Sequence, residues 1–346
     1  MKETNKHPRI AIIVSAFPPL NISGAVQLRD LSLEFFRQGY YPTVFVPSND
    51  IERPWKLENL EGVQVLRLKT PKIREISYVR RTIGEILLSF MMLKNIRKSP
   101  LRNMIWDGIV WYSPTIFFGP LVKVLKKKSD CKSYLIVRDI FPEWAADLGL
   151  ISRGIIYRFF KFVEHYQYSV ANVIGVQTAA NLSYFDKWAK QDGKRIEVLH
   201  NWLAKAPNVG SSFSVSKSTL AGRLIFVYAG NMGIAQGMEI LINLAESLSK
   251  RSDIGFLFVG RGSTVEKLSA DTKTKRLNNM LFHDEIPSSE IPGLFSQCHV
   301  GLITLDQRHK THNIPGKFLS YMQAGLPVLA KINQGNKSAF TYEHKD

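Results

Sequence analysis

Cysteine is scarce in this chain of 346 residues, which contains only Cys131 and Cys298. Two cysteines so far apart in the sequence cannot supply a zinc cluster or a disulfide framework, so a reducing compartment is expected. Long apolar runs are also lacking: the best candidate, Ile83–Leu93, contains Glu85 and is shorter than the roughly 18 residues that a membrane-spanning helix needs. Residues 1–9 show no apolar stretch typical of a signal peptide. We therefore expect a soluble protein of the cytoplasm.

Acidic residues are outnumbered by basic ones. The chain has 29 Asp and Glu against 46 Lys and Arg, which gives a formal net charge of +17. Such an excess indicates a partner that carries phosphates: nucleic acid, an anionic membrane surface or a phosphorylated small molecule. With 45% hydrophobic and 22% charged residues, the composition is that of a folded globular protein, and its length suggests two domains or three.

Short apolar segments alternate with longer amphipathic ones along the chain, which predicts an α/β fold with parallel sheets and helical crossovers. A stretch rich in Ser and Gly, residues 206–222, lacks periodicity and is predicted to be a linker or a long loop. It separates two doubly wound, Rossmann-like domains, 1–205 and 223–346, which we expect to face each other across a cleft. The predicted strands are 10–14, 43–46, 63–68, 108–111, 134–137, 173–176, 196–198, 224–228, 255–259, 280–282, 300–305 and 327–330, and the predicted helices are 25–38, 78–96, 120–128, 154–168, 238–250 and 316–324.

Three loops lie where parallel sheets bind ligands, beyond the carboxyl ends of strands: residues 15–25, 228–237 and 314–328. In the third, Pro315 and Gly316 begin a predicted helix that has Lys317 in its first turn. A cation there opposes the helix dipole, and an anion held beside it would explain its presence. Each loop alone is more typical of an ordinary turn than of a binding site, and it is the placement of all three in two α/β domains that favours ligand binding. A dinucleotide-binding dehydrogenase is disfavoured, because residues 15–24 contain no Gly-x-Gly-x-x-Gly.

Several separated motifs together resemble one family. The sequence is similar to the retaining nucleotide-sugar glycosyltransferases of family 4, which have the GT-B fold, and within them to bacterial O-antigen and capsule enzymes described as L-fucosamine transferases. The resemblance covers about residues 8–332 and rests on Ser-Ala-Phe-Pro-Pro (15–19) with Gly24-Ala25, Arg-Asp-Ile-Phe-Pro-Glu-Trp (138–144), Val-Leu-His-Asn-Trp (198–202), Gly-Asn-Met-Gly-Ile-Ala-Gln-Gly (230–237), Val-Gly-Arg-Gly (259–262) and Pro-Gly-Lys-Phe-Leu-Ser-Tyr (315–321).

The resemblance implies a donor site on the second domain, where backbone N–H groups of a glycine loop hold the diphosphate. Relatives usually have Arg and Lys where this chain has Asn231 and Gln236, which leaves Lys317 as the remaining cation. They also carry two glutamates, the second of which holds the ribose, where this chain has His312 and Ser320. The implied donor-binding residues are Gly230, Asn231, Gly233, Gln236, Gly237, Arg261, Lys317 and Ser320.

On the first domain the resemblance implies that Asp139 and Glu143 are the catalytic carboxylates, with Gly24 and Arg138 on the acceptor side. Both carboxylates follow a predicted strand and are expected to point outward, toward an acceptor hydroxyl or the donor sugar. The alternative is structural: a helix N-cap and an exposed first-turn Glu. His200 is more typical of a strand end than of a catalytic base. No bound metal is expected, since no Asp-x-Asp and no metal-ligand spacing of histidines occurs.

The implied reaction is the transfer of a sugar from a nucleotide diphosphate, with retention and without a further cofactor. The resemblance suggests UDP-linked N-acetyl-L-fucosamine as the donor, a polyprenyl-diphosphate-linked saccharide as the acceptor, O-antigen or capsule synthesis as the process, and a monomer. Two other classes stay open: a catalytically weak or inactive nucleotide-binding module, and a nucleic-acid-binding protein, although no nucleic-acid recognition motif is present.

Positive charge is concentrated in residues 67–102, which contain ten Lys or Arg but only Glu75 and Glu85. Between the basic clusters lies the apolar stretch Ile83–Leu93, and a basic helix with an apolar face is suited to an anionic membrane surface. We therefore expect the protein to lie peripherally on the inner face of the cytoplasmic membrane. An ordinary solvated helix over the first sheet explains the pattern equally well.

The last residues, 331–346, leave no room for the final helix with which family members usually return to the first domain. The sequence therefore predicts an incomplete second domain, with a poorly packed tail and looser hinging between the domains.

Overall fold

The computed structural model describes residues 7–20, 22–74, 76–190, 194–205, 208–308 and 314–332. The chain divides into two compact units, Met1–His200 and Asn201–Asp346. The tail predicted to be poorly packed, from residue 333 onward, lies outside the described residues.

The first unit is built on an eight-stranded sheet in the order β3-β4-β2-β1-β5-β6-β7-β8. Neighbouring strands are parallel, except that β3 runs antiparallel to β4. This antiparallel edge strand was not predicted, because its sequence, Trp-Lys-Leu-Glu-Asn-Leu, has no continuous apolar run and remains partly exposed. The strands are β1 (Arg9–Ile13), β2 (Tyr41–Ser48), β3 (Trp55–Leu60), β4 (Val63–Lys69), β5 (Gly108–Ser113), β6 (Lys132–Val137), β7 (Val173–Val176) and β8 (Arg195–Val198).

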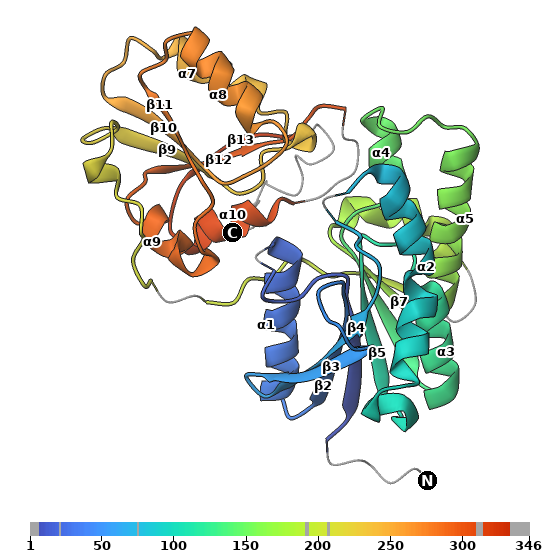
Figure 1. Cartoon of the computed structure of the whole chain (residues 1–346). Coiled ribbons are helices and arrows are strands. Elements are labelled where there is room, and N and C mark those ends of the chain that lie inside the picture. Colours follow the sequence, from blue (N-terminus) through green and yellow to red (C-terminus); the bar gives the residue numbers. More distant parts are fainter. Residues whose placement is uncertain are drawn as a thin grey trace, which may run out of the picture. The chain divides into compact units, whose positions relative to one another are not determined.

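Helices cover both faces of this sheet (Figure 1). Helix α1 (Ser23–Arg37) lies on one face, while α2 (Tyr78–Ile96), α3 (Gly119–Ser129) and α5 (Ile155–Val170) cover the other and share one apolar core with it. Short segments complete the unit: α4 (Glu143–Asp147), α6 (Asp186–Ala189) and the 3-10 turns η1 (Pro100–Asn103) and η2 (Ala179–Phe185). Among the described residues, no helix is both long enough and apolar enough to pass through a membrane.

The second unit is a five-stranded, parallel sheet in the order β11-β10-β9-β12-β13. Its strands are β9 (Leu224–Ala229), β10 (Ile254–Val259), β11 (Met280–His283), β12 (Val300–Thr304) and β13 (Val328–Lys331). Its helical segments are α7 (Glu239–Ser247), α8 (Val265–Thr274), α9 (Ile291–Phe295) and α10 (Gly316–Gln323), with the 3-10 turns η3 (Val215–Lys217), η4 (Ile234–Gln236) and η5 (Ser288–Glu290). The α8 sequence was not predicted to be helical, because it is largely polar and buries only Leu268 and Thr272.

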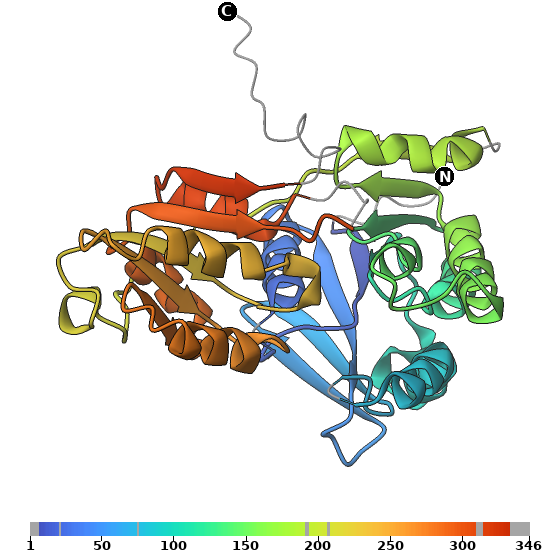
Figure 2. The same ribbon diagram turned by 90° about the horizontal axis from the view of Figure 1, so that it is seen from above.

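Alternation along β9 divides the interior of this unit into two cores. Ile225 and Val227 face the core that contains residues of α9 and α10, whereas Phe226 and Tyr228 face the core that contains residues of α7 and α8. Figure 2 shows the sheet between these two layers of helices. All five predicted strands of this unit are present. The central strands β9, β10 and β12 are largely buried on both faces, as expected for a parallel sheet, whereas the edge strand β13 is partly exposed.

The structure describes residues 208–222 of this predicted linker or long loop, and they pack against the second unit. Val215 and Leu220 are buried in the core beside α9 and α10. The Val215 N–H also donates to Gln297 Oε1 at 2.9 Å. A few apolar residues among many Ser and Gly are enough to fix this segment to the second unit. Because these apolar residues are few and irregularly spaced, the sequence pattern did not indicate that the segment packs there.

Candidate functional site

Helix α10 is held against the second sheet by Tyr321, which is fully buried. Its hydroxyl lies within hydrogen-bond distance of the carbonyl oxygens of Val227 (3.1 Å) and Leu302 (3.2 Å). A Cβ at Gly301 of β12 would lie 2.4 Å from the Tyr321 ring, so only glycine permits this close approach. The first turn of α10 begins at Gly316, as predicted, with Pro315 as its N-cap.

Lys317 therefore lies beside the loop that follows β9. Its Nζ is 4.8 Å from the centroid of the Tyr228 ring. A Cβ at Gly230 would lie 2.9 Å from Lys317 Cε, so the lysine stem runs directly over the Gly230 backbone. Burial lowers the pKa of Lys317 to about 8. Among the described residues no carboxylate pairs with this ammonium, which makes it the group in the loop region most suited to meet an anion.

The glycine loop itself offers fewer N–H groups than the sequence predicted. The Gly230 N–H donates to Val259 O (2.8 Å), and the Gly233 N–H donates to Gln236 Oε1 (2.9 Å). The N–H groups of Gln236 and Gly237 donate to carbonyls within the same loop. These four backbone N–H groups thus donate to atoms of the protein in the described structure, and their contact with a diphosphate stays a prediction. Their hydrogen bonds shape the loop.

Two further glycines explain why the loop has this shape. Gly260 and Gly262 follow β10 and have φ values of 140° and 156°. A Cβ at Gly260 would lie 2.2 Å from Gly230 O, and one at Gly262 would lie 2.1 Å from Met232 O. The loops after β9 and β10 thus pack backbone against backbone, which requires glycine.

The remaining predicted donor residues are spread around this loop. Ser320 is half-buried one turn after Lys317 on α10. The Asn231 side chain donates to Gln236 Oε1 (3.3 Å). Arg261 is largely exposed and its Nε is 3.0 Å from Glu285 Oε2. Gly230 therefore lies beside Lys317 and Ser320 lies one turn further along α10, whereas Arg261 is directed to a carboxylate.

On the first unit, the predicted acceptor-side residues meet through Tyr112 at the carboxyl end of β5. A Cβ at Gly24 would lie 3.5 Å from the Tyr112 ring. Tyr112 also hydrogen-bonds with Arg138, which follows β6, is 6% exposed and donates to Leu199 O at 3.0 Å. Burial lowers the pKa of Arg138, while Tyr112 and the neighbouring Asp139 partly offset the effect. Asp139 is half-buried at the same sheet edge.

Glu143 does not point outward as predicted. Its carboxylate accepts from the Tyr157 hydroxyl (2.7 Å) and lies 3.0 Å from Lys161 Nζ, both on α5. Lys161 is also 2.5 Å from the buried Glu164. Burial opposes ionisation, but the hydrogen bonds from Tyr157 and Lys161 hold the pKa of Glu143 below its ordinary value. Helix α5 passes back beside Glu143. Tyr157 and Lys161 are one turn apart on this helix, so both contact the same carboxylate.

Sequence reasoning missed the partners that define these sites: Tyr228 beneath Lys317, Tyr112 beside Arg138, and the α5 residues around Glu143. Tyr228 and Tyr112 both lie near the carboxyl ends of predicted strands, which is the only signal the sequence contained. His200 is exposed after β8. Within the described ranges no group of three His, Cys, Asp or Glu side chains is placed to hold a metal ion.

Comparison with known proteins identifies the second unit. Residues 223–343 match the family described as Glycosyl transferases group 1. The chain is a glycosyltransferase. This glycosyltransferase is 25% identical over 273 residues to "Probable glycosyltransferase WbjE" of Pseudomonas aeruginosa, covering 77% of this chain and 67% of that protein. It is 23% identical over 315 residues to WcaI of Escherichia coli K12, named for colanic acid biosynthesis, covering 83% and 71%.

Solved structures share the fold at low sequence identity. Sucrose-phosphate synthase of Thermosynechococcus elongatus matches with a TM-score of 0.70 and 12% identity, over 97% of this chain and 84% of that one. HepE of Anabaena, in complex with UDP and glucose, matches with a TM-score of 0.63 and 14% identity, over the same shares. The predicted GT-B fold of this glycosyltransferase, with two parallel α/β units, is thereby confirmed.

The network around Glu143 predicts a structural role for this carboxylate. Glu143→Gln should lower the free energy of unfolding by about 1–3 kcal/mol at neutral pH, because Lys161 and Tyr157 lose the ionised carboxylate that they contact in a half-buried site. Since the folded-state pKa of Glu143 is lowered, its contribution is lost as the pH falls through that value, and the difference from wild type should shrink in acid. Urea denaturation across this pH range measures both effects; an unchanged midpoint at neutral pH would contradict the structural role.

Proposed function

We propose that the enzyme transfers a sugar from a nucleoside diphosphate donor to a lipid-linked saccharide in polysaccharide biosynthesis. The observation that supports this most directly is Lys317: a cation over an aromatic ring, beside a glycine loop at the end of β9, with no carboxylate partner among the described residues. A diphosphate supplies the missing charge. The relative named for colanic acid biosynthesis supports the assignment to polysaccharide synthesis.

In the proposed reaction the bond between the anomeric carbon and the diphosphate oxygen breaks, and a bond to the acceptor oxygen forms on the same face. The acceptor proton passes to the leaving phosphate, which gives retention without an enzyme nucleophile. Negative charge grows on the diphosphate as the bond breaks. Lys317 and the N-terminal end of α10 stabilise that charge, which is where an enzyme of this type gains most of its rate.

The donor nucleotide is proposed to be UDP, with N-acetyl-L-fucosamine as the sugar. The HepE structure, which contains UDP, supports the nucleotide. Ser320 lies one turn from Lys317 on α10 and is the proposed hydrogen-bond partner of the ribose. Asn231, Gly233, Gln236 and Gly237 shape the loop against which the donor lies, and no further cofactor is required. Arg261 remains a donor candidate only if it leaves Glu285.

On the first unit, Asp139 is the proposed positioning carboxylate, because it lies half-buried at the carboxyl edge of the sheet, directly after β6. Arg138 and Tyr112 hydrogen-bond beside the loop that carries Asp139, and Gly24 of α1 lies next to Tyr112. A catalytically weak nucleotide-binding module is the second candidate. In that case nucleotide should bind at Lys317, and substitution of Asp139 should change no reaction rate. A nucleic-acid-binding protein would instead show a thermal shift with RNA and none with UDP or GDP.

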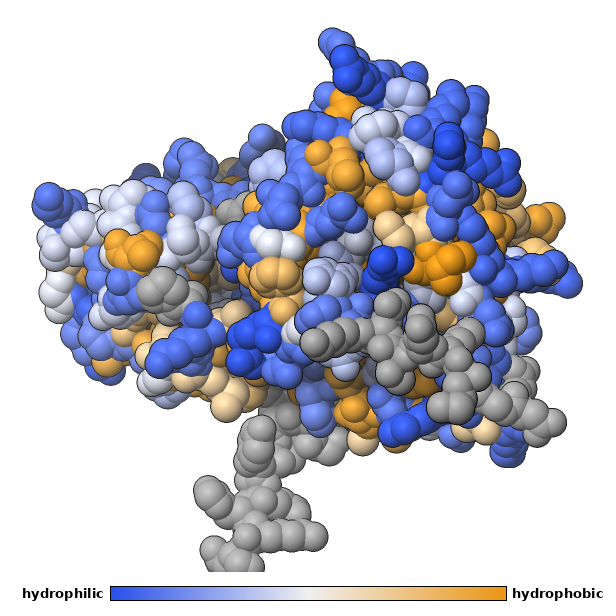
Figure 3. Space-filling model, turned by 90° about the horizontal axis from the view of Figure 1, so that it is seen from below, coloured by the Kyte–Doolittle hydropathy of each residue, from blue (hydrophilic) through white to orange (hydrophobic). Residues whose placement is uncertain are grey.

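The acceptor is proposed to be linked to a polyprenyl diphosphate at the inner face of the cytoplasmic membrane, with the enzyme acting as a monomer. Helix α2 presents large apolar side chains to solvent, with Tyr78 77%, Ile83 54% and Phe90 60% exposed. Arg80, Arg81 and Lys94 lie on the same helix. Hydrophobic patches among hydrophilic residues are visible on the first unit in Figure 3. This combination favours association with an anionic bilayer.

The donor site is tested by Lys317→Met, with Lys250→Met on the second unit as the matched control. Loss of a charge-assisted contact should weaken UDP binding by roughly 1.5–3 kcal/mol, about 10- to 150-fold. Because the pKa of Lys317 in the free protein is about 8, wild-type affinity should fall as the pH rises above that value, while the Met variant stays flat. Calorimetry at several pH values measures this. Unchanged UDP affinity in the Met variant would remove Lys317 from the site.

The role of Asp139 is tested by Asp139→Asn. Sugar transfer should fall by about 100-fold or more, whereas the urea midpoint should change little, because a half-buried loop carboxylate has little packing to lose. Glu143→Gln is the matched control, with the opposite expectation. Parallel losses of turnover and stability in Asp139→Asn would favour a helix-capping role.

Membrane association is tested by sedimentation with phospholipid vesicles. The wild-type protein should sediment more with anionic than with neutral vesicles, and Phe90→Ser should weaken the association about tenfold by removing one exposed ring. Val209→Ser on the second unit, at a side chain that is 62% exposed, is the control and should have no effect. Equal sedimentation with both vesicle types would exclude the electrostatic part of the proposal.

A further inference from the structure

Helix α10 is attached near both of its ends to one short segment of the second unit, residues 201–204. At the N-terminal end, Asn201 Nδ2 donates to the carbonyl oxygen of Ile314 at 2.9 Å. At the C-terminal end, Gln323 Nε2 donates to Ala204 O at 3.2 Å. The residues joined by these contacts are 113 and 119 positions apart in the sequence. The beginning of the second unit is therefore fixed to a helix near its end.

The two contacts require residues 201–204 to run along the helix. Helix α10 has eight residues and is about 12 Å long at 1.5 Å per residue. The three steps from residue 201 to residue 204 span only about 10 Å when fully extended. The segment can reach both ends of α10 only if it is close to extended, with the side chains of Asn201 and Gln323 covering the remaining distance. A segment with so few conformations left is a firm support for the helix.

The contact with Asn201 acts on the start of α10. Pro315 is the N-cap, and its carbonyl accepts from the Phe318 N–H at 3.0 Å. The Ile314 carbonyl precedes this hydrogen bond and lies outside the helix. Because proline has no N–H, the N-cap itself cannot donate to any neighbouring segment. A side chain that binds the Ile314 carbonyl therefore fixes where the first turn begins.

Lys317 lies between two attachment points of the helix. It follows Ile314 by three residues and precedes the buried Tyr321 by four. A helix held only at Tyr321 can pivot about that ring, whereas a helix also held at Ile314 cannot. Gln323 lies beyond Tyr321, so its contact does not restrain the turn that carries the lysine.

We propose that Asn201 is a positioning residue for Lys317: it holds the Ile314 carbonyl, fixes the first turn of α10 and so keeps the lysine stem over the Gly230 backbone. The proposal rests on the proposed function, because it concerns the same donor site, and it names the residue that aligns the cation there. Side chains that bind a ligand have to be held within about 0.5 Å of their working geometry by supporting residues. Asn201 is such a support.

The surroundings of Lys317 provide an observable for this role. The side chain is half-buried, and burial is the cause of its lowered pKa of about 8. If the first turn of α10 loosens, the ammonium gains contact with water and its pKa should rise toward the ordinary value. A hydrogen bond that only stabilises the fold would change the free energy of unfolding and leave this pKa unchanged.

The test is trace labelling of the full chain with acetic anhydride at several pH values, measured at Lys317 by mass spectrometry. Only the neutral amine reacts, so the labelling profile gives the pKa of this lysine without any ligand. In Asn201→Ala the midpoint should rise by roughly one pH unit, and calorimetry should show UDP affinity about fivefold weaker. Asn201→Ser, whose hydroxyl is too short to reach Ile314 O, should behave in the same way. Asn201→Gln keeps an amide donor and should recover part of both properties.

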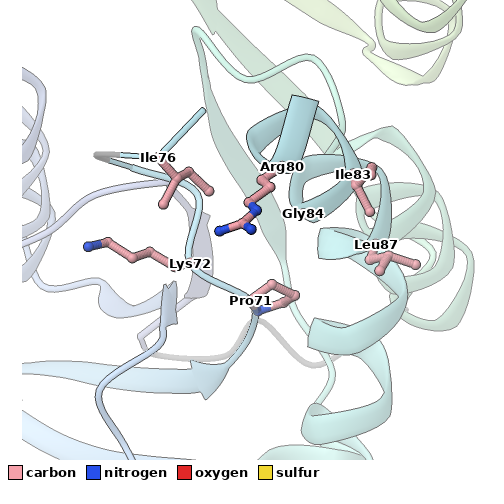
Figure 4. A pocket seen from close by; sticks show the side chains of 7 residues that line it. All are labelled: Pro71, Lys72, Ile76, Arg80, Ile83, Gly84 and Leu87. Atoms are coloured by element: carbon pink, nitrogen blue, oxygen red, sulfur yellow. The ribbon is translucent and has the colours of Figure 1, made fainter. Parts of the chain in front are cut away.

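Gln323→Ala is the matched control. It removes the same kind of contact, from an amide to a backbone carbonyl, at the other end of α10, and it should leave the Lys317 midpoint and UDP affinity unchanged. Lys72 is the internal reference for the labelling. It is an exposed lysine of the first unit, beside a pocket of about 330 Å³, and Figure 4 shows its side chain extending away from α2. Its labelling profile should be the same in every variant.

Three results would overturn the proposal. The first is an unchanged Lys317 midpoint in Asn201→Ala and Asn201→Ser, and the second is an equal rise in Gln323→Ala, which would show that any loosening of α10 has this effect. The third is failure of both Asn201 variants to fold, which would indicate a structural role.

UDP binding by the same samples separates this inference from the proposed function. A midpoint that rises in a protein without UDP binding keeps the role of Asn201 and removes the donor assignment. UDP binding together with an unchanged midpoint in the Asn201 variants keeps the donor assignment and removes this role. Absence of both effects overturns both.

Discussion

The packing of Tyr321 into the space left by Gly301 is the contact on which the second unit depends most. It fixes α10 to β9 and β12, and so fixes Lys317 over Tyr228 and the Gly230 backbone. Removing a lysine ammonium from water without a carboxylate partner is unfavourable, which is why the pKa of Lys317 is lowered. A helix less firmly attached would let the lysine swing into solvent. The lowered pKa of Lys317 therefore depends on how α10 packs against the sheet as well as on the loop after β9.

Asp139 and Glu143 lie in different surroundings in the first unit. Asp139 stays at the edge of the sheet near Arg138, whereas Glu143, only four residues later, is drawn into hydrogen bonds with Tyr157 and Lys161. Both residues were equal candidates in the sequence. The difference arises because α4 begins at Glu143 and α5 returns past it, so the environment of the second carboxylate is set by residues that follow it by fourteen and more positions.

This contrast shows what the sequence could and could not predict. Helix α2 and strand β7 have the predicted bounds, because their apolar patterns are local and strong. The first turn of α10 was also predicted, since Pro315 and Gly316 mark a helix start by local chemistry. The ring beneath Lys317 could not be predicted, because it depends on the distance between two strands and a helix. The hydrogen bonds of the loop N–H groups could not be predicted either. Only the folded loop shows that Val259 O accepts from the Gly230 N–H and that Gln236 Oε1 accepts from the Gly233 N–H.

The lowered pKa of Lys317 also couples ligand binding to the proton balance of the solution. A free protein whose ammonium has a pKa of about 8 carries a partly neutral amine at mildly alkaline pH. An anion bound beside that amine favours its charged form and raises its pKa. Binding would then draw a proton from the solvent, and the measured heat would include the ionisation heat of whichever buffer supplies it. Because Lys317 is buried, the binding of an anion beside it would thus be accompanied by proton uptake.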